Sequence, residues 1–276
     1  MDLSAEKRSK LEERHEFWWG TNRDAPSRIR RKVQGLRSMN KVRLQLVCDT
    51  YYRHVLGRDQ LHSVDTSDTA TPLLGARICE VGCGGGLLAE ALVQLGADVV
   101  AIDCDEYDVL TAKAHWRETQ GRDRIGPSYH NASVKEFSQA HPGEFDMVIC
   151  SEQLQYQHIN GLEYVPYICK LVRDGGCVFF TTNNRSLPAL LFIIGWMEHV
   201  AGTMPAFTHR FHRFIKPDEI ADVVRRCGFE TINVAGFIPL GMTARLKWRM
   251  QWFLTSFIGV WYALIAKKAE HVYGGQ

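Results

Sequence analysis

The feature that most constrains this chain is a cluster of glycines between two apolar runs, in the stretch CEVGCGGGLLAEAL at residues 79–92. Four of the five residues at 82–86 are glycine. The run before them is strand-like, and the run after them is helix-like. Glycine allows backbone conformations and close approaches that other residues do not. The stretch therefore predicts a strand, a tight loop lying against a ligand, and a helix.

Strand-like and helix-like segments alternate after this loop. Strands are predicted at 76–81, 98–103, 145–151 and 176–182, with a turn at 173–176, and helices at 87–94, 107–119 and 161–171. Such alternation is typical of an α/β fold with a mostly parallel sheet and helices on both faces. Further helices are predicted at 4–17 and 42–56, and 254–268 reads as a pair of strands or a strand with a turn.

Two ligands compete for the glycine loop. A dinucleotide loop has the form G-x-G-x-x-G, but counting from Gly82 places Leu87 at the third glycine. The alternative is an acidic residue followed by glycine at +2, +4 and +6, which Glu80, Gly82, Gly84 and Gly86 satisfy. This pattern resembles motif I of the Rossmann-like S-adenosylmethionine (AdoMet) methyltransferases. The resemblance implies that the loop cradles the amino-acid half of AdoMet and that Glu80 orients this half. Asp103, at the end of the next strand, can accept hydrogen bonds from the ribose hydroxyls.

Charge and cysteine usage limit the partners and the cellular compartment that the chain can have. The net charge is +2, yet residues 1–43 hold twelve Lys/Arg against six Asp/Glu, so this segment favours an anionic surface or ligand group. The eight cysteines include no C-x-x-C pair, which indicates a reducing compartment without a disulfide framework. The first 19 residues lack a signal-peptide core and are too acidic for a typical transit peptide, so an imported protein would be present as its mature or trimmed form.

Further stretches carry a narrower resemblance. FWWG near the N-terminus, GLRSMNKVRLQLV at 35–47 and THRFHRFIKPDEI at 208–220, together with the glycine motif, resemble the ubiquinone-biosynthesis O-methyltransferases over nearly all of the chain. The resemblance implies a class I AdoMet methyltransferase with a seven-stranded sheet, a helical cap at 1–60 and a methyltransferase domain at 61–276. It implies that Arg43 reaches the AdoMet carboxylate, that Gly82 and Asp103 contact the cofactor, and that Ser151 closes over it. Asn131 stands where many AdoMet enzymes hold an acid near the adenine.

The same resemblance implies a divalent metal, Mg or Zn, held by an E-x-x-E-H cluster after the fourth strand. The corresponding stretch here is SEQLQYQH at 151–158, in which Glu152 matches the first ligand. Without a gap the next two ligands become Gln155 and Tyr156, and with a short insertion they become Gln157 and His158. Either alignment replaces a carboxylate by an amide, which hard cations bind less well. Glu152 and His158 could hold a borderline metal.

The alternative is metal-free catalysis. In that case His158, or His209 or His212 before the FIKPDEI segment, would take the phenol proton as a general base. The lid after Pro205 reads Ala206 and Phe207 where the family tends to carry a basic residue and glycine.

An apolar stretch at 187–207, within a lid-like insertion at about 187–214, has only about eleven uninterrupted apolar residues and is too short to span a bilayer. It is either a helix packed on the sheet edge or a membrane contact, to which FWW and the basic N-terminal run would add apolar insertion and attraction to anionic lipid. The resemblance favours contact with the membrane that holds a polyprenylated phenolic substrate, and with other ubiquinone-biosynthesis proteins. It implies the matrix side of the mitochondrial inner membrane in a eukaryote, or the cytoplasmic face of the inner membrane in a bacterium.

The sequence therefore predicts an AdoMet-dependent O-methyltransferase that methylates a catechol-type hydroxyl and binds no nucleic acid. Two rivals remain. One is an AdoMet methyltransferase acting without metal on another small hydroxyl or amine. The other is a catalytically silent AdoMet-binding subunit of a lipid-biosynthetic complex.

Overall fold

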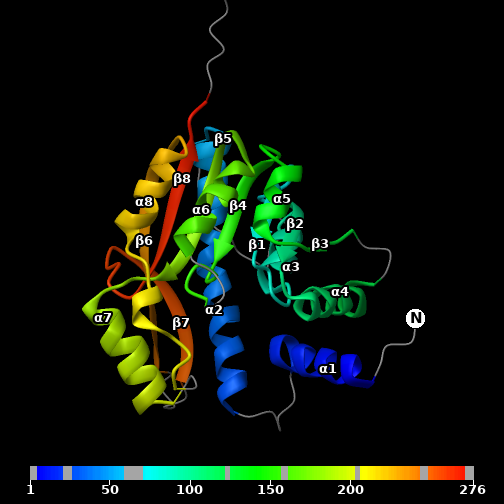
Figure 1. The fold of residues 1–276 in the computed structure, drawn as a ribbon, viewed down its shortest axis with the longest axis vertical. Helices are drawn as coiled ribbons and strands as arrows, with labels where there is room; N and C mark the ends of the chain where they lie inside the picture. The colour runs from blue at the N-terminus through cyan, green and yellow to red at the C-terminus, as the bar shows by residue number, and fades with distance from the viewer. Residues whose placement is uncertain are drawn as a thin grey trace, which may run out of the picture.

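The computed structural model describes residues 5–20, 27–58, 71–121, 125–156, 161–202, 206–242 and 248–270. Within these ranges one eight-stranded sheet runs in the order β3-β2-β1-β4-β5-β8-β6-β7 (Figure 1). The strands are β1 (Arg77–Val81), β2 (Asp98–Asp103), β3 (Ser128–Asn131), β4 (Phe145–Ser151), β5 (Val172–Asn183), β6 (Phe229–Met242), β7 (Trp248–Thr255) and β8 (Trp261–Lys268). β1 to β5 pair in parallel, whereas β8 runs antiparallel to β5 and β6.

The helices that follow these strands cover both faces of the sheet. α3 (Leu87–Gln94) and α4 (Glu106–Gln120) pack with α2 (Ser27–Thr50) in one hydrophobic cluster. α5 (Val134–Ala140), α6 (Gly161–Lys170) and α8 (Pro217–Arg226) pack in the other. The predicted α/β fold with a mostly parallel core and helices on both faces is therefore confirmed, with one strand more than expected.

The N-terminal helices differ in how they join this core. α1 (Ala5–Trp19) lies against α4, as Figure 1 shows. α2 begins fifteen residues before the predicted helix at 42–56 and leads into a π-helix, η1 (Tyr51–Val55). Met39, Val47 and Tyr51 belong to the main hydrophobic core. Part of the predicted cap at 1–60 therefore packs in the same core as the domain predicted at 61–276. The division between the two stays a prediction.

Two local expectations were wrong or incomplete. The predicted turn at 173–176 lies inside β5, where the pairing with β4 shifts register between Phe145 and Met147, so the polar residues form an irregular strand start. The apolar stretch after β5 forms α7 (Leu187–Ala189) and then a π-helix, η2 (Leu190–Val200), before the short η3 (Phe211–Arg213). The C-terminal segment forms β7 and β8, as one of the two alternatives predicted.

Candidate functional site

The glycine loop joins the carboxyl end of β1 to α3 and has the backbone that its sequence predicts. Gly82 and Gly86 have φ values of +78° and +86°, and Gly86 is the N-cap of α3. A Cβ on Gly86 would lie 2.3 Å from the Tyr129 hydroxyl oxygen, so a larger residue does not fit. The Gly84 N–H donates to Asp103 Oδ2 at 2.9 Å, which ties the loop to the end of β2.

Three charged side chains are buried beside this loop. Arg43 on α2 and Glu80 on β1 are both 4% exposed, and Arg43 Nη2 lies 3.6 Å from Glu152 Oε1. Arg43 Nη1 donates to Asn40 Oδ1 at 3.3 Å. Arg43 Nε and Nη2, Glu80 Oε2 and Glu152 Oε1 have no hydrogen-bond partner. Burial raises the pKa of Glu80 to about 8, against the opposing effect of Arg43.

These unpartnered atoms fit the amino-acid half of AdoMet. A buried polar atom without a partner is costly, and here the donors and acceptors divide by charge. The Arg43 nitrogens can donate to a carboxylate, and the Glu80 and Glu152 oxygens can accept from an ammonium group. The sequence prediction that Arg43 and Glu80 bind the amino-acid half of AdoMet stays a prediction.

Glu152 occupies a strained position directly after β4. Its φ of +56° is uncommon for a residue with a side chain, and its N–H donates to Thr181 O at 2.9 Å. Its Oε2 accepts from the Gln155 amide nitrogen at 3.0 Å. The predicted metal ligand Glu152 is thus paired with Arg43 and Gln155. The other predicted ligand, His158, lies outside the described residues, as does Gln157.

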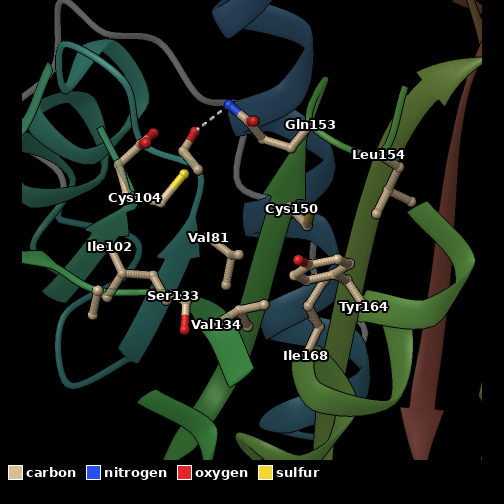
Figure 2. Close-up of a pocket in the computed structure, with 13 residues that line it drawn as sticks. Val81, Ile102, Cys104, Ser133, Val134, Cys150, Gln153, Leu154, Tyr164 and Ile168 are labelled. Atoms are coloured by element: carbon tan, nitrogen blue, oxygen red, sulfur yellow. Dashed lines mark hydrogen bonds between the residues drawn. The ribbon is translucent and has the colours of Figure 1, made fainter. Parts of the chain in front are cut away.

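An apolar pocket lies between the carboxyl ends of β1, β2 and β4. Ile102, Val134, Leu154 and Ile168 line it, and Figure 2 shows them facing one another across the opening. Gln153 points toward the loop, and its amide donates to Gly82 O at 2.9 Å. A flat apolar group such as an adenine ring suits these walls. The sequence predicted Gly82 and Asp103, which also line this pocket, but not its apolar walls, because these are ordinary apolar side chains from five separate segments.

The remaining predicted cofactor residues differ in where they lie relative to this pocket. Asp103 lines the pocket, and its other oxygen accepts from the Asp105 N–H at 2.9 Å. Asn131 does not line the pocket, and its amide nitrogen donates to Asp103 O at 3.0 Å. Its neighbours Ala132 and Ser133 line the pocket instead. Ser151 Oγ is 2.8 Å from Thr181 Oγ1, so it joins the ends of β4 and β5.

His209 lies away from the glycine loop, in the segment between η2 and α8. Its Nδ1 is 2.7 Å from Glu198 Oε1, and its backbone N–H donates to the same oxygen at 2.8 Å. Glu198 is buried at the end of η2. Glu198 is a charged residue within an apolar run of the sequence. That position was the signal that could have identified it as the partner of His209. His212 lies in η3.

The tryptophan pair of α1 covers the glycine loop. The Trp18 indole packs against Gly84 and Gly85, and its Nε1 donates to Asp108 Oδ1 at 2.8 Å. Trp19 Nε1 donates to Gly85 O at 2.8 Å, and its ring stacks on His115. From sequence, FWW and the basic N-terminal run were candidates for membrane contact. The structure places the tryptophan pair as the outer wall of the loop.

Comparison with known proteins agrees with this geometry. Residues 52–234 match the family model described as a methyltransferase domain. The chain is 39% identical over 183 residues to a ubiquinone biosynthesis O-methyltransferase of Thiobacillus denitrificans, covering 65% of this chain and 76% of that protein. It is 37% identical over 199 residues to the enzyme of the same name from Methylococcus capsulatus, covering 72% and 79%.

Solved structures support the fold independently. Magnesium protoporphyrin IX methyltransferase from Synechocystis, solved with bound S-adenosylhomocysteine (SAH), superposes with a TM-score of 0.56 at 15% identity, over 96% of this chain and 95% of that one. A SAM-dependent methyltransferase from Methanosarcina mazei has a TM-score of 0.51 at 15% identity, over 71% and 93%. With the matches in sequence, the chain belongs to the ubiquinone biosynthesis O-methyltransferase family of AdoMet-dependent methyltransferases.

Proposed function

We propose that this protein transfers the methyl group of AdoMet to a catechol-type hydroxyl of a polyprenylated intermediate of ubiquinone biosynthesis. The observation that carries the proposal is the buried ionic set of Arg43, Glu80 and Glu152 beside the glycine loop. Its unpartnered atoms match the carboxylate and ammonium groups of AdoMet. The names of the family relatives supply the acceptor class.

Each end of the site has a separate task. Arg43 would bind the cofactor carboxylate, Glu80 the ammonium group, and Asp103 the ribose hydroxyls. When bound, AdoMet would supply a methyl group carried by a positively charged sulfur, and SAH would remain once the acceptor oxygen has taken the methyl group. The chain contributes mainly by aligning the acceptor opposite that sulfur and by excluding water.

His209 is the described residue that we propose as general base. Its hydrogen bond to the buried Glu198 fixes the ring and stabilises the imidazolium that forms when the phenol proton is taken. The segment that carries it crosses the carboxyl end of β5, where the Ile215 N–H donates to Asn183 O at 3.2 Å. β5 is the neighbour of β4 in the sheet, and we propose that this end of β5 forms the acceptor side of the site, with the cofactor side at β1 and β4.

The insertion at 187–214 would receive the prenyl tail at a membrane surface. Leu191, Trp196 and Val200 are 62%, 48% and 67% exposed and recur along η2, and Phe207 is 80% exposed. Exposed apolar surface of this kind favours insertion into the interfacial layer of a bilayer. No helix in the described part of the chain is long and apolar enough to cross a membrane. We therefore propose a peripheral location on the membrane that holds the substrate, the inner membrane of a bacterium or of a mitochondrion.

The test is methyl transfer from labelled AdoMet to catechols with short and long prenyl tails, in the presence of lipid vesicles. We expect turnover of both, with the longer tail favoured on vesicles, and we expect His209→Ala to lower kcat by about 10²-fold or more while SAH binding is unchanged. SAH binding without turnover of any catechol would instead support a silent subunit. Transfer to an amine but not to a phenol would support the other rival.

A further inference from the structure

A continuous polar chain connects β5 to α2 through the loop after β4. Thr182 Oγ1 donates to Gln155 Oε1 at 2.7 Å, and the Gln155 amide nitrogen donates to Glu152 Oε2 at 3.0 Å. Glu152 Oε1 lies 3.6 Å from Arg43 Nη2. Thr182 is fully buried, and only 17% of the Glu152 side chain is exposed. The chain is thus shielded from solvent at both ends.

The direction of these bonds determines what Gln155 can bind. A carboxylate only accepts hydrogen bonds, so the Gln155 amide must turn its NH₂ group toward Glu152. The Thr182 hydroxyl donates to the opposite, carbonyl end. A cation ligand would need an oxygen lone pair facing Glu152, and Gln155 presents N–H groups there instead. The amide therefore blocks Glu152 Oε2 from sharing a cation with residue 155.

The charges around Glu152 also disfavour a divalent cation. The Arg43 guanidinium already neutralises Glu152, and a divalent cation bound to that carboxylate would lie beside a second positive group. Hard cations need several oxygen ligands, with carboxylates preferred. Glu152 and Gln155 therefore do not fit the metal site that the family resemblance implies.

We propose that Gln155 is a positioning residue that holds Glu152 as the counter-ion of Arg43, and so fixes Arg43 for the AdoMet carboxylate without a divalent cation at this cluster. The strained φ of +56° at Glu152 is held by the bond from its N–H to Thr181 O, and Gln155 fixes the side chain of the same residue. The inference rests on the proposed function only through cofactor binding.

The test replaces the amide by the carboxylate that the family motif carries. In Gln155→Glu two carboxylates meet at hydrogen-bond distance, so the variant should melt at a lower temperature than the wild type at pH 8 and bind SAH about tenfold more weakly. Mg²⁺ or Mn²⁺ should restore both properties by bridging the two carboxylates. The wild type should show the same melting temperature and the same SAH affinity with either cation and with EDTA.

Two variants control for charge and for the lost hydrogen bond. Gln139→Glu adds the same charge on the exposed face of α5 and should show no response to the cations. Gln155→Met keeps the length of the side chain but removes the amide, so SAH binding should weaken and no cation should restore it.

A wild-type protein stabilised by Mg²⁺ or Mn²⁺, with the response lost in Glu152→Gln, would overturn the inference. So would a Gln155→Glu variant that behaves alike with and without cation. None of these measurements uses a methyl acceptor. Absence of turnover alongside the expected cation responses would therefore defeat the proposed function and leave the role of Gln155 standing.

Discussion

Glu80 is the residue whose titration the cofactor should change most. With a pKa of about 8 it holds a proton at pH 7 in the free protein. An ammonium group beside it favours the ionised form, so SAH binding at pH 7 should release about one proton. Calorimetric titrations in two buffers of different ionisation enthalpy would measure the release. Equal binding enthalpies in the two buffers would contradict this role, and Glu80→Gln should remove the buffer dependence.

The same raised pKa sets a trend in stability. The unfolded chain loses the Glu80 proton near the ordinary pKa of 4.5, whereas the folded chain keeps it until about pH 8. The folded state therefore binds more protons in between, and the Glu80 contribution to the free energy of unfolding falls as pH rises from about 4.5 to 8. Urea unfolding of the wild type and of Glu80→Gln should show a gap between their pH profiles that changes in this direction over that window. Parallel profiles would show that Glu80 titrates as an ordinary carboxyl.

At the scale of elements, the docking of α1 depends on Gly85, whose φ lies outside the left-handed region that favours glycine. A Cβ on Gly85 would lie 2.3 Å from Trp18 Cγ. We expect Gly85→Ala to push α1 away from the loop and to lower the free energy of unfolding by about 1–3 kcal/mol. Trp18→Gly removes both the ring and the Trp18 Cβ, which would lie 2.5 Å from the added methyl group. In that background the methyl group should cost little, so the double variant should be about as stable as Trp18→Gly alone. Additive losses in urea unfolding would mean that Gly85 matters for another reason.

Periodicity predicted the elements well where one segment sufficed. The helix at Leu87–Gln94 and the strands at Asp98–Asp103 and Phe145–Ser151 have the expected bounds because each carries a clear apolar period between turn residues. The start of α2 was missed because its first turns are rich in arginine and lysine, although Ile29, Val33 and Leu36 follow a helical spacing. The turn expected at 173–176 falls within the bounds of β5, but its residues have no partner on β4. The pairing passes from Phe145–Val172 to Met147–Cys177, and Gly175 has a φ of +74°.

The candidate site divides in the same way. The glycine loop, Glu80 and Asp103 could be predicted because they lie within 25 residues of one another in a known order. The contacts of Gln155 with Thr182 and of Glu198 with His209 join segments whose distance in space no spacing reveals. Residue types alone do not show which polar groups face a ligand. Burial adds this information, because a buried oxygen without a hydrogen-bond partner is a candidate for contact with a ligand, whereas an exposed oxygen can bond to water.

At the scale of the whole molecule, one edge of the sheet collects apolar side chains from distant parts of the chain. Phe253 and Phe257, near the end of β7, are 45% and 50% exposed, and Trp261 contacts both Phe192 of η2 and Trp252 of β7. We define this apolar edge as the exposed side chains Leu187, Leu191, Phe192, Trp196, Val200, Phe207, Phe253, Leu254 and Phe257. Figure 1 shows α7 and β7 at the same end of the molecule.

If the apolar edge contacts a bilayer, charge at either part should weaken binding. Trp196→Lys and Phe257→Lys should each reduce the fraction of protein that sediments with anionic vesicles by several-fold. Leu74→Lys is the matched control, because Leu74 is 74% exposed and lies before the amino end of β1, an interior strand that β4, β5, β8 and β6 separate from β7. Equal losses in all three variants would point to general charge effects and against a membrane-facing edge.

The position of β8 in the sheet also affects how the protein is made. Although it is the last strand in chain order, it lies between β5 and β6 and pairs with both. Until it leaves the ribosome, β5 ends the sheet with an open edge and β6 has no neighbour on its inner side. A nascent chain can therefore complete the cofactor loop early, while the acceptor side stays unbuilt and its backbone groups stay open to wrong partners. Synthesis would thus complete the cofactor loop before the proposed acceptor side.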